Sequence, residues 1–187
     1  MGWAAKLIDR ATWTRFAFWF AAFWAVSWFF FYRESAWTRA LKAGGGKLPE
    51  SQPGFPPLEP QRSLEALEVA SATQDYILWQ ALDLPFAFVV VMMTATAIAL
   101  GLKGAGLRSL SFPLAVPPLY FVMELVENAF VAAFAAKIAA PAEAVVLVQQ
   151  TATTIKMGAG WGAIWLALLG LAAASVSAII RIFRKRA

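Results

Sequence analysis

The chain has 187 residues, of which 60% are hydrophobic and 14% are charged, and its formal net charge is +5. Soluble domains are about 45–50% apolar and about 25% charged, so this composition excludes an ordinary soluble domain. The sequence contains no His and no Cys. The preferred ligands of zinc, haem, copper and iron–sulfur centres are therefore missing, and Cys–His and Ser–His–Asp catalysis are excluded. We expect an integral membrane protein with no metal site and no cofactor.

Four apolar segments are long enough to cross a bilayer, which takes roughly 20 residues as a helix. The first, 14–32, is rich in Trp and Phe, and no small-residue cleavage site follows it, so we expect a retained helix and not a signal peptide. The others are 77–100, 110–134 and 158–182. Strands of a membrane barrel would be shorter and would alternate in polarity. The sequence predicts an all-α integral membrane protein, a four-transmembrane-helix bundle that forms one membrane domain over 1–187.

The longest connection, residues 33–76, joins the first and second spans and has its own organisation. Gly and Pro are frequent over 43–60, which predicts an irregular segment. Residues 63–72 follow, with apolar side chains suited to one helix face and Ser63 suited to the N-cap position. We expect a short interfacial helix here, on the outer surface of the membrane.

The positions of the basic residues indicate the orientation of the chain. Nine of the sixteen Lys and Arg residues lie in the N-terminal tail, in the turn between the second and third spans, and in the C-terminal tail. The 33–76 loop is near neutral, with five basic and six acidic residues. Because positive charge concentrates on the cytoplasmic side, both termini are predicted to be cytoplasmic and the protein to lie in the cell inner (plasma) membrane.

The same charge distribution bears on partners. We expect the lipid bilayer as a partner, with contact between the basic C-terminal tail and anionic lipids. Nucleic-acid binding would need a basic face with stacking aromatic residues, and we do not expect it.

Three acidic residues fall inside the predicted spans: Asp83 in the second span, and Glu124 and Glu127 in the third. At 1.5 Å per residue, Asp83 and Glu127 lie about 9 and about 10 Å from the outer ends of their spans, with Glu124 about one turn deeper. Consecutive spans run antiparallel, so the three carboxyl groups should converge on one layer. Ionisable residues at membrane depth are costly and mark candidate functional positions.

Helical spacing extends this layer into a polar stripe. Tyr120, Glu124, Glu127 and Asn128 stand at i, i+4, i+7 and i+8, on one face of the third helix. Carboxylates that converge in a low dielectric must be protonated or must acquire a cation. Lys156 is the best candidate for that cation.

The start of the fourth helix decides whether Lys156 can reach the layer. Pro141 and Glu143 suit the first turn of a helix, which places its start near Ala142. Lys156 would then enter the membrane with Thr153 and Gln149 on its face. Farther along, small residues at Gly158, Gly160 and Gly162, and the Ala and Gly residues beyond, predict close helix approach.

The order of these motifs resembles that of a known family. A Tyr shortly before Asp83, the Glu124-Leu-Val-Glu127-Asn128 stretch and the Thr153-Thr-Ile-Lys156 element are similar to the pattern of an uncharacterised family of bacterial four-helix inner-membrane proteins. The resemblance covers roughly residues 53–182 and implies a fold and a topology, with no activity to transfer; Glu124 stands where Asp is commoner in that pattern. A weaker likeness is to the four-helix sterol-isomerase and sigma-2-receptor-like group, which implies chemistry near buried carboxylates.

Three functional hypotheses follow. The first is an accessory or assembly subunit of a larger membrane complex, whose buried polar cluster holds the bundle together. The second is a bundle that binds, with or without catalysis, a lipid-like, hydrophobic or cationic small molecule through Asp83, Glu124 and Glu127, with Tyr120 and Asn128 orienting it and Lys156 tuning the acids. The third is a proton or ion pathway, which ranks last because the inner halves of the spans look dry. The balance leans away from an enzyme.

Overall fold

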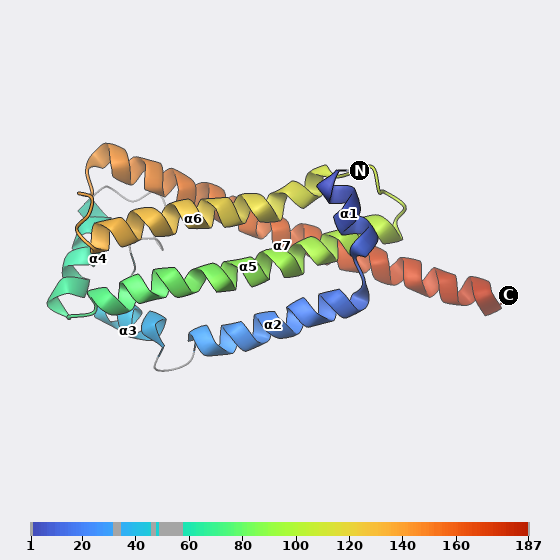
Figure 1. Cartoon of the computed structure of the whole chain (residues 1–187), viewed down its shortest axis with the longest axis horizontal. Helices are drawn as coiled ribbons and strands as arrows, with labels where there is room; N and C mark the ends of the chain where they lie inside the picture. The colour runs from blue at the N-terminus through green and yellow to red at the C-terminus, as the bar shows by residue number, and fades with distance from the viewer. Residues whose placement is uncertain (1, 32–34, 46–47, 49–57, 187) are drawn as a thin grey trace. The chain divides into compact units, whose positions relative to one another are not determined.

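The computed structural model describes residues 2–31, 35–45, 48 and 58–186 (Figure 1). All regular structure in these residues is helical, in the order α1 Trp3–Arg10, α2 Trp13–Phe31, α3 Ala36–Ala43, α4 Leu58–Val69, α5 Thr73–Gly104, the short 3₁₀ helix η2 Phe112–Ala115, α6 Val116–Ala135 and α7 Glu143–Arg186. Four segments are long and apolar enough to cross a membrane: α2, α5, η2 with α6, and α7 up to Arg184. The predicted all-α architecture with four candidate membrane spans is confirmed.

The helices that contain the second and fourth spans are longer than their apolar segments. Helix α7 begins at Glu143, as the Pro141 signal indicates, and its 44 residues extend over about 66 Å at 1.5 Å per residue. A hydrocarbon core is about 30 Å thick, so α7 is too long to lie wholly within it. Helix α5 likewise begins at Thr73 and has 32 residues. Both helices therefore extend beyond the predicted spans 77–100 and 158–182, because polar turns continue the backbone hydrogen bonding of the apolar helix; the span limits themselves stay a prediction.

The short helices α1 and α3 were not predicted, and α4 starts earlier than expected. Helix α3 is capped by Ser35, whose side chain accepts a hydrogen bond from the backbone N–H of Thr38 at 3.2 Å. Helix α4 begins at Leu58, so Ser63 lies inside it and is buried, and the prediction of Ser63 as N-cap is wrong. Of the predicted irregular segment 43–60, residues 46–47 and 49–57 lie outside the described part of the chain.

The chain divides into two compact units, each made of segments distant in sequence. The first unit comprises Met1–Phe23, Phe88–Tyr120 and Gly158–Ala187. Its core combines Ala4 and Ile8 of α1 with small and aliphatic residues of α5 and α7. Lys103 at the end of α5 donates hydrogen bonds to the carbonyl oxygens of Asp9 at 2.9 Å and Ala11 at 3.0 Å, and so satisfies carbonyls at the C-terminal end of α1.

Helices α5 and α7 approach to backbone contact within this unit. A Cβ atom added at Gly101 would lie 2.3 Å from the Cα of Gly170, and one added at Gly170 would lie 2.6 Å from the carbonyl oxygen of Ala97. By contrast, a Cβ added at Gly158 would meet no atom within 4 Å. The closest approach therefore joins Gly101 of α5 to Gly170 of α7, and Gly170 is one of the Ala and Gly residues beyond the glycines named from sequence.

The second unit comprises Trp24–Ala87 and Phe121–Met157. Its apolar core includes Phe30 of α2, Leu67 of α4, Tyr76 and Trp79 of α5, and Val131 of α6. Two ion pairs link its helices near their ends: Arg39 to Asp75 at 2.6 Å, and Lys137 to Glu68 at 2.7 Å. The prediction of a single domain over 1–187 stays a prediction.

Candidate functional site

The second unit contains a buried polar cluster in which Lys156 of α7 contacts two carboxylates of α6. The Lys156 Nζ atom forms an ion pair with the carboxylate of Glu127 and lies 3.4 Å from Oε1 of Glu124. Glu127 is fully buried and Glu124 is 2% exposed. The sequence predicted that Lys156 would be the cation of the carboxyl layer, and the geometry brings these three residues together.

A second series of contacts reaches Glu127 from the same face of α7. The hydroxyl of Thr153 donates to the carboxylate of Glu127, and Nε2 of Gln149 donates to the Thr153 hydroxyl at 2.9 Å. Gln149, Thr153 and Lys156 stand at i, i+4 and i+7, the spacing that aligns side chains along one helix face. Both Thr153 and Gln149 are buried. Glu127 therefore receives a hydroxyl and an ammonium from one helix, which ties α6 to α7.

The α5 side of the cluster is held by an amide. Nδ2 of Asn128 donates to the backbone carbonyl of Gln80 at 3.3 Å, and both side chains are buried. Asp83 is half-buried on α5 and lies within electrostatic range of Lys156. Three acidic residues thus act on one ammonium, two of them by direct contact.

Tyr120, the remaining residue of the predicted stripe, belongs to the first unit. There its ring lies against α7, where a Cβ added at Gly160 would be 3.3 Å from Cδ2 of Tyr120. Its assignment to ligand orientation stays a prediction.

Two buried side-chain oxygens in the cluster accept no hydrogen bond from the described residues. Oδ1 of Asn128 and Oε1 of Gln149 find no hydrogen-bond partner within the described part of the chain. Burying such an oxygen without a donor costs free energy, on the order of 1–3 kcal/mol. These two oxygens favour an additional hydrogen-bond donor in the cluster. Within the described ranges, no group of three or more Asp or Glu side chains is arranged to hold a metal ion.

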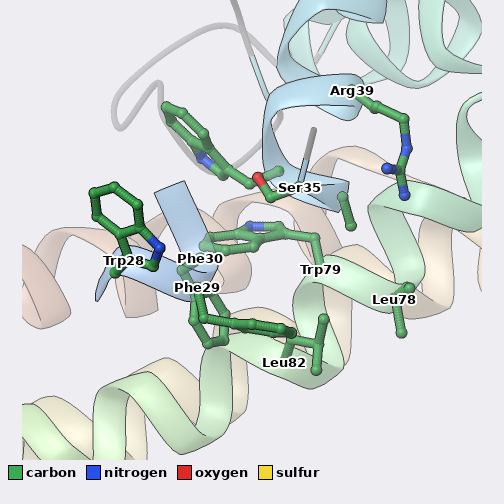
Figure 2. Close-up of a pocket in the computed structure, with 10 residues that line it drawn as sticks. Trp28, Phe29, Phe30, Ser35, Arg39, Leu78, Trp79 and Leu82 are labelled. Carbon is green, nitrogen blue, oxygen red and sulfur yellow. The ribbon is translucent and has the colours of Figure 1, made fainter. Parts of the chain in front are cut away.

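A pocket of about 490 Å³ lies elsewhere in the second unit, at the end of α2 and the starts of α3 and α5 (Figure 2). Its walls are mainly aromatic and aliphatic, with Ser35 and Arg39 as polar members: Trp28, Phe29, Phe30, Ser35, Ala36, Trp37, Arg39, Leu78, Trp79 and Leu82. Sequence reasoning missed this site because it did not predict α3. The available signal was Ser35, an N-cap residue type that precedes Ala36 and Ala40, both of them buried at i, i+4 spacing.

Comparisons with protein-family models, with curated proteins and with solved structures found no significant match to this chain.

Proposed function

We propose that this protein is an accessory or assembly subunit of a larger membrane complex, and that α2 is the helix that meets the partner. The buried cluster of α6 and α7 then has a structural role, because its ion pairs and hydrogen bonds join two helices. The proposal includes insertion in the cell inner (plasma) membrane with both termini cytoplasmic, as the distribution of Lys and Arg favours. It also includes membership of the four-helix inner-membrane family that the motifs resemble.

The exposure of α2 carries this proposal. Phe30 is the one buried residue of this 19-residue helix. Large aromatic side chains are exposed along its length, including Phe18, Trp24 and Trp28. Tryptophan is enriched at the two membrane–water interfaces, yet Trp24 lies near the middle of α2. An exposed aromatic helix face with Trp at mid-depth suits packing against another protein, since aromatic residues are enriched at protein–protein interfaces.

Site-specific photocrosslinking tests the proposal. A benzophenone amino acid is placed at Trp24 of α2 or at Trp165 of α7, two tryptophans with matched exposures of 60% and 62%. In intact membranes, position 24 is expected to give one discrete protein adduct and position 165 only lipid adducts.

Native mass spectrometry after mild detergent extraction supplies the second measurement. We expect a stoichiometric complex that Trp24→Ala weakens and Trp165→Ala retains. A monomer with no co-purifying protein, together with identical lipid adducts at both positions, would refute the accessory role.

The unpartnered oxygens of Asn128 and Gln149 favour a second candidate function. In this alternative the cluster of Asp83, Glu124 and Glu127 binds a cationic or hydroxylated lipid-like molecule, whose ammonium or hydroxyl hydrogens satisfy those oxygens. Dodecylammonium is a suitable probe, with retention measured by native mass spectrometry.

Asp83→Asn and Glu127→Gln are expected to abolish dodecylammonium retention, while Glu143→Gln, at an exposed position in the first turn of α7, leaves it unchanged. If the first two variants destabilise the fold but retain the probe as the parent does, this second function is wrong.

A further inference from the structure

The aromatic pocket of the second unit has the composition of a small-molecule site. Its volume of about 490 Å³ lies within the roughly 300–1,000 Å³ of ligand pockets, which are mainly apolar with a few convergent polar groups. It takes no part in the polar cluster, and it shares Trp28 with the exposed face of α2 that is proposed to meet a partner. Its position at the end of α2 and the start of α5 places it near one end of two candidate spans, where a ligand's tail can continue into lipid.

The walls favour a flat ring. Trp79 lies at the centre of the lining in Figure 2, with Phe30 beside it. The ring centroids of Phe30 and Trp79 are 5.2 Å apart at 70°, and those of Trp37 and Trp79 are 6.2 Å apart at 55°. These edge and tilted contacts hold Trp79 in place. An aromatic wall fixed in this way interacts well with a planar π-system by stacking or edge contact.

The polar groups favour an uncharged ligand that accepts hydrogen bonds. Arg39 lines the pocket, at the edge above Leu78 in Figure 2, and forms an ion pair with Asp75 at 2.6 Å, so the net charge of this pair is zero. A guanidinium has five N–H donors and can hold a carboxylate and a ligand oxygen together, and the indoles of the lining add further N–H donors. A carboxylate or phosphate head group would compete with Asp75 for Arg39, whereas a neutral carbonyl oxygen would not displace it.

We propose that this pocket binds the head group of an isoprenoid quinone. Such a ligand combines a planar uncharged ring, carbonyl oxygens that accept hydrogen bonds, and an apolar tail. The ring lies against Trp79, one carbonyl oxygen accepts from the Arg39 guanidinium, and the tail leaves along α2 past Trp28 and Phe29. The alternative occupants, an acyl chain of a phospholipid or a sterol, lack the planar conjugated ring that these walls suit.

The test uses the purified full chain in detergent and a benzoquinone carrying a ten-carbon chain. Native mass spectrometry is expected to detect saturable binding of one probe per chain, and 1-decanol, which has the same chain without the ring, is expected not to compete. Leu82→Trp fills the pocket and should lower affinity at least about tenfold. Leu168→Trp, on an exposed position of α7 outside the pocket, should bind as the parent does.

A second pair of variants tests the polar contact. The neutral double variant Arg39→Gln with Asp75→Asn should weaken binding by about tenfold, because a charge-assisted hydrogen bond is lost. Its matched control is Arg108→Gln with Asp9→Asn, which neutralises an ion pair of 3.3 Å in the first unit and should leave binding unchanged. Thermal unfolding of each variant shows that the fold persists.

Three results would overturn the proposal. The first is equal competition by 1-decanol, which would assign the pocket to any alkyl chain. The second is displacement of the probe by a diacyl phospholipid or a sterol at equal concentration. The third is parental affinity in a folded Leu82→Trp variant. None of these results depends on whether α2 binds a partner protein, so the accessory role is tested separately.

Discussion

Lys156 is the residue on which the buried cluster depends, because its one ammonium contacts the carboxylates of both Glu124 and Glu127. Taking charges out of water is expensive, and mutual attraction compensates only when the geometry and the hydrogen bonds are good. The hydroxyl of Thr153 supplies such a bond to Glu127. Removing one partner is therefore far more damaging than removing the whole set of charges.

The first prediction concerns this asymmetry. Lys156→Met is expected to lower the free energy of unfolding by about 3–5 kcal/mol, because it leaves buried carboxylates without their cation. Titration with a denaturing detergent, followed by circular dichroism, measures the change. The triple variant Lys156→Met with Glu124→Gln and Glu127→Gln should recover most of the loss, since it also neutralises the two carboxylates that contact the lost ammonium.

Lys137→Met is the matched control at the residue scale. Lys137 pairs with Glu68 at 2.7 Å, but their side chains are 72% and 58% exposed, and exposed pairs contribute little to stability. This variant should unfold almost as the parent does. Equal stability of Lys156→Met and the parent would show that the cluster does not hold α6 to α7.

At the scale of elements, the contact between α5 and α7 is set by two glycines. The Cα of Gly170 occupies the space that a Cβ of Gly101 would need, at 2.3 Å. Small residues let helix backbones approach closely in membranes, where van der Waals packing replaces the hydrophobic effect as the force between helices. The contact leaves no flexible side chain to move aside, so a methyl group cannot be accommodated without separating the helices.

The second prediction compares two glycines of the same helix. Gly170→Ala should destabilise the fold by about 1–3 kcal/mol through overpacking against the carbonyl of Ala97. Gly158→Ala has open space around the new methyl group and should be neutral or stabilise by about 0.5–1 kcal/mol, because alanine is the better helix former. Detergent unfolding of the two variants under one set of conditions decides between them. Equal destabilisation at both positions would contradict the close contact.

At the scale of the whole molecule, the distribution of charge predicts how the chain is inserted. Basic residues concentrate in both tails and in the turn between the second and third spans, while the loop before α5 is near neutral. From the positive-inside rule we predict that both tails are cytoplasmic and that α4 lies on the opposite side of the membrane.

The third prediction exploits the absence of cysteine from the chain, which makes any introduced cysteine the only thiol. Gln61→Cys of α4 should react with a membrane-impermeant maleimide in cells whose outer membrane is permeabilised and whose inner membrane is intact. Lys6→Cys and Arg184→Cys should react only after the inner membrane is also permeabilised. All three positions are exposed, so differences in labelling report the side of the membrane. The opposite labelling pattern would show that both tails lie on the outer side of the membrane and α4 on the cytoplasmic side.

Much of the fold and part of the site followed from sequence patterns. Apolar runs are the signal of membrane helices, and the i, i+3 and i+4 spacing of Glu124, Glu127 and Asn128 placed them on one face of α6. The same reasoning selected Lys156 as the cation, since Pro141 and Glu143 marked the start of α7. Helix α3 was not predicted because a short helix lacks a hydropathy signal. The aromatic pocket was therefore not predicted either, since α3 forms part of its wall.

By itself the sequence determined the all-helical architecture, the four apolar spans and the presence of costly charges within them, because these depend on local periodicity and on the price of polarity in lipid. Only the tertiary structure decided which glycines bring α5 and α7 into contact, which carboxylates Lys156 touches, and that Trp79 and Arg39 line one pocket. Such contacts join residues far apart in the chain, and they depend on how helix faces meet, which no local pattern specifies.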